Sequence, residues 1–343
     1  MRSVFYPHLI NGPFGDPALY VRLAHHKDAL LFDCGDLHRL SAGQKPKIRS
    51  VFISHAHVDH IIGFDSLIRS FLYTERTLLL YGPPGIIERI SHRLAGYTWN
   101  LFEDFRFTLV VREWGAAGGR ETTFRAARAF QADGPREFCC RDGRLHQTPH
   151  YSVRTIALDH GGIPSLAFCL EESLHIAIHK DALEREGYLP GPWLTSFKDR
   201  LREGYDLQQG IRIPLAGGGT TEASLENLAE RIAHVERGMK LVYVTDASPC
   251  DRNLSAIVEL AADAHLLVIE APFSHADLSR AKERNHLTAR LAGEIARAAQ
   301  AQRLLVFHHS PRYGAEGDLL GREALQAFQS PGFTRGQTIS PDP

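Results

Sequence analysis

The residues best suited to chemistry stand together in the segment SVFISHAHVDHIIGF, residues 50–64. It carries four candidate metal ligands: His55, His57, Asp59 and His60. A strand runs into them, and its alternation points His55 and His57 the same way. Asp59 and His60 fall at the expected start of a helix, where a tight turn can direct them to a second cation. A polar loop after a strand is the simpler alternative, but burying so many imidazoles without metal would require many hydrogen-bond partners. The segment therefore predicts a two-metal centre.

Two cations need further ligands, and candidates follow other predicted strands. Asp159 and His160 end one strand, Asp246 ends another, and His308 and His309 end a third. In layered α/β folds, ligands gather at the carboxyl ends of strands. Each residue alone is weak evidence, because an Asp or His after a strand is more often a turn or cap residue. Their recurrence at three strand ends favours one shared site.

The elements that must position these residues follow an α/β pattern. Short apolar runs predict strands at residues 29–32, 51–53, 78–81, 155–158, 241–245, 266–269 and 304–307. Helical stretches lie between them at 61–73, 86–94, 225–237 and 289–301. We expect one domain over residues 1–343. The turn-rich LPGPW and LAGGGTT predict an irregular insertion within it at about 181–222.

Composition narrows the classes of function. The 39 basic residues balance 40 acidic ones, so any nucleic-acid binding must depend on a local patch. Five cysteines, an odd number, suit a reducing compartment better than a disulfide framework. No apolar run approaches the roughly 20 residues that span a bilayer. The start of the chain does not read as a secretory signal, so the expected location is the cytoplasm and no membrane partner is expected.

Five motifs together resemble the metallo-β-lactamase fold hydrolases. They are FDCGD at 32–36, HAHVDH at 55–60, LDHGGIPSLAF at 158–168, VTDA at 244–247 and FHHSPRY at 307–313. The resemblance covers nearly the whole chain, and within that superfamily it points to the ribonuclease Z group of transfer-RNA 3′ processing enzymes. It implies a four-layer αββα sandwich and a homodimer.

The resemblance also implies how the ligands are shared. One cation would be held by His55, His57 and His160, the other by Asp59, His60 and His308, and Asp246 would bridge the two. Zinc suits such a nitrogen-rich set, although manganese or iron would fit too. Asp33 is expected to orient a ligand histidine rather than to bind metal.

Two further segments, IEAPF at 269–273 and NHLTA at 285–289, resemble paired motifs of ribonuclease Z. They imply that Glu270 orients His286, a general acid whose pKa the carboxylate would raise. With Asp59, these two complete the expected catalytic residues. Read without the family, Glu270 is a strand end and His286 a neighbour of a helix cap.

Ser310, Arg312 and Tyr313 follow the last ligand closely enough to contact a substrate phosphate, although a salt-bridged loop is the alternative. The function expected from all these residues is an endoribonuclease that cuts the 3′ trailer from precursor transfer RNA. One alternative is a hydrolase of the same fold acting on a small phosphodiester such as a cyclic nucleotide, or on a thioester or lactone. Another is a catalytically silent scaffold that binds RNA or protein, which would be expected to lack ligands.

Overall fold

The computed structural model describes residues 4–24, 26–100 and 104–330. By their contacts, the residues fall into two compact units. Unit 1 comprises Met1–Leu145, Arg154–Cys169 and Leu241–Pro343, and unit 2 comprises His146–Val153 and Leu170–Lys240. The expectation of a single domain stays a prediction, and each unit is described by itself.

An eight-stranded sheet in unit 1 follows the chain order from β1 to β8. Its strands are β1 (Phe5–Leu9), β2 (Leu19–Leu23), β3 (Ala29–Phe32), β4 (Ile48–Phe52), β5 (Thr77–Gly82), β6 (Thr108–Gly115), β7 (Gly118–Arg125) and β8 (Arg136–Phe138). The central strands β3 to β6 pair in parallel, and the outer ones pair antiparallel. Parallel pairing in the centre brings the carboxyl ends of β3, β4 and β5 to one edge.

A second sheet has the strand order β18-β17-β16-β11-β10-β9. Its strands are β9 (Arg144–Gln147), β10 (Tyr151–His160), β11 (Ile163–Glu172), β16 (Lys240–Val244), β17 (Leu266–Glu270) and β18 (Leu304–Phe307). The last three strands pair in parallel. Their carboxyl ends therefore place Asp246, Glu270 and His308 along one edge.

Aromatic side chains join the inner faces of the two sheets. Phe32 of β3 lies 5.8 Å from both Phe168 of β11 and Tyr243 of β16, measured between ring centroids. Phe52 of β4 lies 5.7 Å from Phe168. All four side chains are buried. Large rings of this kind bury much apolar area and fix the spacing of the sheets.

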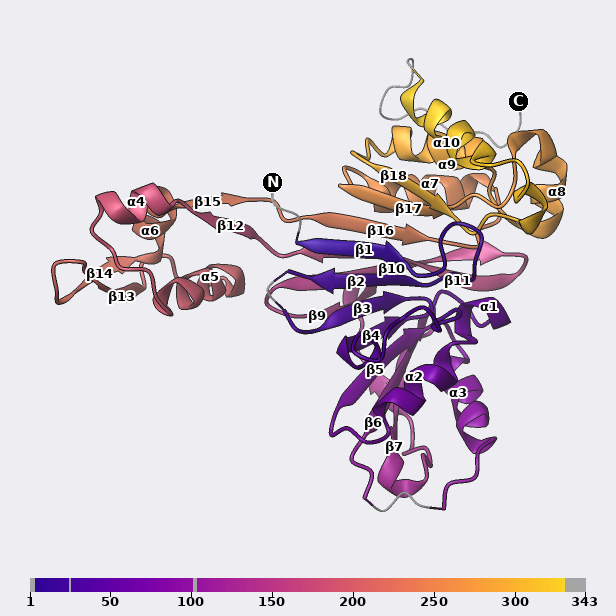
Figure 1. Ribbon diagram of the computed structural model, residues 1–343, viewed down its shortest axis with the longest axis horizontal. Coiled ribbons are helices and arrows are strands. Elements are labelled where there is room, and N and C mark those ends of the chain that lie inside the picture. Colours follow the sequence, from indigo (N-terminus) through magenta and orange to yellow (C-terminus); the bar gives the residue numbers. More distant parts are fainter. Residues whose placement is uncertain (1–3, 25, 101–103, 331–343) are drawn as a thin grey trace. The chain divides into compact units, whose positions relative to one another are not determined.

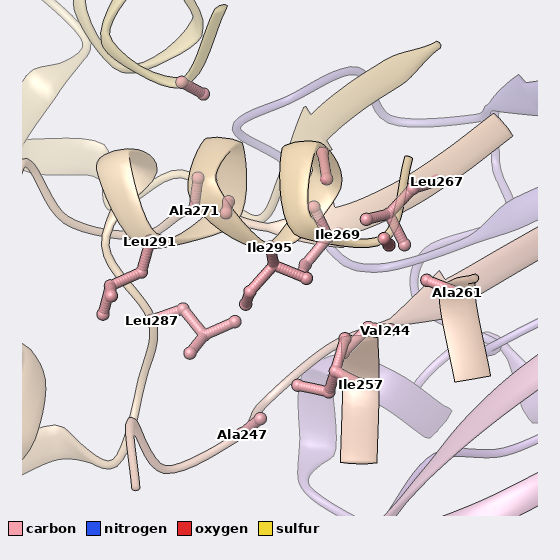
Figure 2. Close-up of a cluster of buried hydrophobic side chains, with 14 of the residues drawn as sticks. Val244, Ala247, Ile257, Ala261, Leu267, Ile269, Ala271, Leu287, Leu291 and Ile295 are labelled. Atoms are coloured by element: carbon pink, nitrogen blue, oxygen red, sulfur yellow. The ribbon is translucent and has the colours of Figure 1, made fainter. Parts of the chain in front are cut away.

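Helices cover the two outer faces (Figure 1). The first sheet packs against α1 (Val58–Ile61), α2 (Phe64–Phe71) and α3 (Ile86–Ala95). The second packs against α7 (Asp251–Ala261), α9 (Ala289–Ala298) and α10 (Leu319–Gln329), while α8 (Leu278–Arg284) precedes α9. Figure 2 shows Ile295 of α9 reaching toward Ile269 of β17, and Ile257 of α7 beside Val244 of β16. The layers are helix, sheet, sheet, helix, which confirms the predicted αββα sandwich.

The structure corrects two predicted helices. The helix expected at 61–73 is divided into α1 and α2 around Gly63, where a Cβ would lie 2.1 Å from the carbonyl oxygen of Gly35. The helix expected at 225–237 ends at Ile232 as α6 (Leu225–Ile232), and β15 (Ala233–Glu236) follows. Pairing of β15 with β12 (His175–Ile178) overrides the helical pattern there.

Unit 2 is more regular than the insertion expected at about 181–222. That stretch contains α4 (Lys180–Arg185), α5 (Trp193–Glu203) and the antiparallel pair β13 (Gly210–Pro214) and β14 (Thr220–Ser224). Trp193, Phe197, Ile213 and Leu228 are buried in a core of its own. Burial of these apolar side chains stabilises the helices and strands of unit 2, which its turn-rich sequence did not predict. In the part of the chain that the structure describes, no helix combines the length and the apolar character needed to cross a membrane.

Candidate metal centre

The first group of ligand atoms comes from four residues on three separate segments. His55 and His57 follow β4, His160 ends β10, and Asp246 follows β16. One ligand atom from each lies within 4.8 Å of every other. Nε2 of His55 is 3.4 Å from Oδ2 of Asp246, and Nε2 of His160 is 3.5 Å from the same oxygen. Three imidazoles thus converge beside one carboxylate oxygen.

The second group gathers around the other oxygen of Asp246. It contains Asp59, His60 and His308, whose ligand atoms also lie within 4.8 Å of one another. Oδ1 of Asp246 is 3.5 Å from Nε2 of His60 and 3.0 Å from Nδ1 of His308. Oδ2 of Asp59 is 3.3 Å from Nε2 of His308. Because Asp246 faces one group with each oxygen, its carboxylate has the geometry of a bridge.

Buried nitrogen atoms test whether cations fit here. Nε2 of His55, Nε2 of His60 and Nδ1 of His308 are buried, and none has a hydrogen-bond partner among the described residues. Burial of such atoms without partners is costly, so native structures rarely keep them. Two divalent cations would satisfy all three, one at His55 in the first group and one at His60 and His308 in the second. The donor set of imidazoles and carboxylates therefore fits a pair of divalent ions.

Asp33 touches one of the candidate ligands and lies in none of the candidate metal groups. Its Oδ2 lies 2.9 Å from Nδ1 of His60 and accepts a hydrogen bond from the Tyr243 hydroxyl at 2.9 Å. The backbone N–H of Ser54 donates to Oδ1 at 2.7 Å. Such a partner fixes the tautomer and directs Nε2 toward a metal. Sequence reasoning missed Ser54 and Tyr243, which carry no motif signal of their own.

Another contact that the sequence did not reveal orients His160. Nδ1 of His160 lies 2.8 Å from the backbone carbonyl oxygen of Asn285 and donates to it. The donor and acceptor are 125 residues apart. No side-chain motif can report a backbone acceptor, so this contact becomes visible only in the folded chain.

Electrostatics separates the histidines into two kinds. Burial and the neighbouring His60 lower the pKa of His55 to about 3, which keeps it neutral, as a ligand must be. Burial opposes a charge on His60 too, but Asp246 and Asp33 raise its pKa to about 10. Burial raises the pKa of Asp59, yet the hydrogen bond to His308 and the charge of His60 lower it to about 2. A protonated His60 thus balances the negative charge of the neighbouring carboxylates, and a bound cation would take the place of that proton.

Glu270 and His286 form a tight pair beside both groups. Oε2 of Glu270 is 2.7 Å from Nδ1 of His286, and Glu270 is fully buried. Oε1 accepts hydrogen bonds from the backbone N–H groups of Ala247 at 2.9 Å and Leu287 at 3.1 Å. The His286 ring centroid lies 5.1 Å from that of His160 and 5.7 Å from that of His308.

The charges of this pair stabilise each other. Burial raises the pKa of Glu270, but His286 lowers it to about 2. Burial lowers the pKa of His286, and the Glu270 carboxylate more than reverses this effect, so that the net shift is upward. The imidazolium form therefore persists to higher pH than for an ordinary histidine. A protonated imidazole beside two metal positions can act as a general acid.

The segment after His308 is tied to the protein itself. The Tyr313 side chain is buried, and its hydroxyl accepts from the N–H of Ser274 at 3.2 Å and donates to Asp277. These internal partners satisfy the hydroxyl. Nη1 of Arg312 lies 3.8 Å from Oδ2 of Asp277. The phosphate contacts expected of Tyr313 and Arg312 stay predictions. A substrate contact by Ser310 stays a prediction.

Known proteins resemble this chain over most of its length. A family model described as anti-Pycsar protein Apyc1 matches residues 20–107. Ribonuclease Z from Deinococcus radiodurans is 32% identical over 94% of this chain and 94% of its own length. Ribonuclease Z from Methanothermobacter thermautotrophicus is 28% identical over 83% of this chain and 78% of its own length.

Two solved structures share the fold. The metallo-β-lactamase fold protein YhfI from Bacillus subtilis aligns with a TM-score of 0.50 and 17% identity, covering 94% of this chain and 92% of its own. The short form of human tRNase Z aligns with a TM-score of 0.50 and 19% identity, covering 91% and 93%. The fold is therefore the metallo-β-lactamase fold, and the identity to the Deinococcus enzyme over nearly both whole chains shows that this protein belongs to the ribonuclease Z family of metal-dependent hydrolases.

Proposed function

We propose that this chain is an endoribonuclease that cleaves the 3′ trailer from precursor transfer RNA. The observation that carries the proposal is the Glu270–His286 pair, joined at 2.7 Å beside two groups of metal-ligating atoms. Hydrolysis of a phosphodiester expels an alkoxide, which needs a proton. Hydrolysis of a thioester expels a thiolate, a better leaving group. The pair therefore favours phosphodiesters over thioesters.

In the proposed centre, His55, His57 and His160 would hold one cation, and Asp59, His60 and His308 would hold the other. Asp246, which faces both groups, would be shared between them. Zinc is the proposed metal because nitrogen ligands predominate, although manganese and iron fit the same donors. When bound, the two cations supply the positive charge that acidifies water and neutralises the phosphoryl oxygens.

Residues of the chain orient the ligands and donate the proton that the reaction needs. Asp33 holds the His60 ring in the orientation that presents Nε2, and the Asn285 carbonyl does the same for His160. Oε2 of Glu270 accepts a hydrogen bond from the protonated Nδ1 of His286, so the Nε2–H is free to donate its proton to the departing 3′ oxygen. The scissile phosphate would lie between the metal positions and this imidazole.

A second candidate is a hydrolase of a small phosphodiester such as a cyclic nucleotide. Unit 2 favours it through its charge, since its residues include 9 Lys and Arg against 12 Asp and Glu. A unit with a net negative charge is expected to bind an RNA backbone weakly, because phosphate binding depends on cationic side chains. The Glu270–His286 pair serves both candidates equally.

The test incubates zinc-loaded protein separately with precursor transfer RNA and with a cyclic nucleotide. We expect one endonucleolytic cut at the boundary of the 3′ trailer, which sequencing of the product ends would locate. H286A should slow this cut strongly, by about 10²- to 10⁴-fold, while H92A, a substitution in α3 outside the centre, should leave its rate unchanged. Cleavage of the cyclic nucleotide alone would replace the first candidate by the second. The predicted homodimer and the cytoplasmic location remain predictions.

A further inference from the structure

A single residue connects a proposed metal ligand to the proposed general acid. Asn285 ends α8 with φ 59° and ψ 43°, the left-handed helical conformation. Its N–H donates to the carbonyl oxygen of Lys282, and the N–H of His286 donates to that of Ala281 at 2.9 Å. These bonds hold the turn in one conformation.

The carbonyl of Asn285 points at a ligand histidine. It accepts the hydrogen of His160 Nδ1 at 2.8 Å, so the lone pair of that imidazole is on Nε2. Nε2 is the atom that lies 3.5 Å from Oδ2 of Asp246, within the first ligand group. The acceptor on Nδ1 thus decides which nitrogen faces the cation.

The residue after Asn285 is the proposed general acid. His286 reaches Glu270 with its Nδ1, and the N–H of Leu287 donates to the other oxygen of the same carboxylate. The direction of the Asn285 carbonyl relative to the following side chain depends on the φ and ψ of Asn285. In the right-handed or extended region, the same chain could not aim the carbonyl at His160 and the imidazole at Glu270 together.

We infer that Asn285 is a positioning residue that aligns the metal ligand His160 with the general acid His286 through its left-handed backbone conformation. The inference rests on the proposed function for the role of His286. Asn is among the few residues other than glycine that adopt this conformation readily.

The side chain of Asn285 contributes less than its backbone. Its Oδ1 lies 3.3 Å from Oγ of Ser248, a long contact. Ser248 has one hydroxyl hydrogen, and Oδ2 of Asp159 lies closer to it, at 2.8 Å. The hydroxyl therefore donates to Asp159, and the amide of Asn285 holds no strong bond that would explain its presence.

The test compares N285G with N285V. Glycine adopts the left-handed conformation freely, while a β-branched side chain resists it. We expect N285V to bind zinc about 10- to 100-fold more weakly at the His160 position and to lose turnover as well. N285G should lie much closer to the wild-type protein in both respects. Zinc affinity is measured by competition with a chromogenic chelator, which requires no substrate.

Gln300 provides the matched control. It also has a left-handed conformation, with φ 54°, two residues after the end of α9, and it is exposed. Q300V introduces the same backbone conflict away from the ligands, so it should lower the melting temperature yet leave zinc affinity and turnover unchanged. A loss of zinc in Q300V equal to that in N285V would mean general destabilisation and would overturn the inference.

Other outcomes are equally decisive. Wild-type zinc affinity in N285V would show that the conformation of residue 285 is irrelevant. A loss in N285G as large as in N285V would assign the effect to the amide side chain. If N285V does not fold, N285A must fall below N285G in zinc affinity, and the reverse order refutes the inference. Failure of the wild-type protein to cut RNA would count against the proposed function alone, because the zinc comparison still judges Asn285.

Discussion

Replacement of Glu270 by glutamine tests the general acid most directly. The amide oxygen of E270Q can keep both backbone donors, Ala247 and Leu287, which approach the same carboxylate oxygen. Its NH₂ group then faces Nδ1 of His286, 2.7 Å from the present oxygen position. An amide donor at that distance accommodates only an imidazole without a hydrogen on Nδ1. The substitution therefore favours the neutral imidazole, which is a poor acid.

The sign of the pH effect follows from the pKa shift. Glu270 raises the pKa of His286, although burial opposes the shift, so the wild-type acid form survives to higher pH and is lost as pH rises through that pKa. In E270Q this loss should begin at lower pH, and the alkaline limb of kcat should move in that direction. General acid catalysis is typically worth 10²- to 10⁴-fold. A loss of about 10²-fold, or about 2.7 kcal/mol of transition-state stabilisation, is expected at mildly alkaline pH.

The assay compares two substrates whose leaving groups differ. Precursor transfer RNA expels a basic 3′ oxygen that needs a proton, whereas bis-p-nitrophenyl phosphate expels p-nitrophenolate, which does not. E270Q should slow the first reaction strongly and the second little. In an H286A background, E270Q should slow RNA cleavage no further, because the two residues act as a unit. Equal slowing of both substrates with zinc retained, or an unmoved alkaline limb, would refute the reasoning.

Three further substitutions probe the support of the centre and the core. D33N removes the carboxylate from Nδ1 of His60 and should weaken binding of one cation about 10- to 100-fold in a chelator competition; unchanged affinity would deny Asp33 its orienting role. G63A places a Cβ 2.1 Å from the carbonyl oxygen of Gly35 and should lower the free energy of unfolding by about 1–3 kcal/mol in urea, so wild-type stability would contradict the close approach. I295A truncates a fully buried side chain and should cost about 2–5 kcal/mol without changing zinc content; a loss of zinc would show that the core and centre are coupled.

Much of the centre could be predicted because its ligands follow strands with strong local signals. The strand predicted at 304–307 matches β18, and the one at 266–269 differs from β17 by a single residue. Apolar runs that end in a turn predict where a strand stops, and the residues after it are then candidates for a shared edge. For Asp246 and His308 taken singly, a turn or cap residue was the more frequent interpretation, and the family resemblance supplied their expected roles.

The contacts that orient the ligands could not be predicted in this way. Tyr243 reaches Asp33 across 210 positions of sequence, and Asn285 reaches His160 across 125. Both contacts depend on how elements pack, which periodicity within one element does not encode. The ordered core of unit 2 could not be predicted for a related reason, since it is assembled from short helices and strands separated by turns. Turn-rich composition predicted irregularity where local packing produced order.

Asp33, Asp246, Asn285 and His308 all have positive φ angles, between 47° and 60°. Glycine would adopt these backbone angles with less strain. Replacement by glycine would relieve that backbone strain, but each replacement would also remove a side chain from the centre or its support. A library of glycine substitutions screened for thermal tolerance therefore needs a parallel screen for zinc retention, because the same replacement changes both the backbone strain and the ligand set.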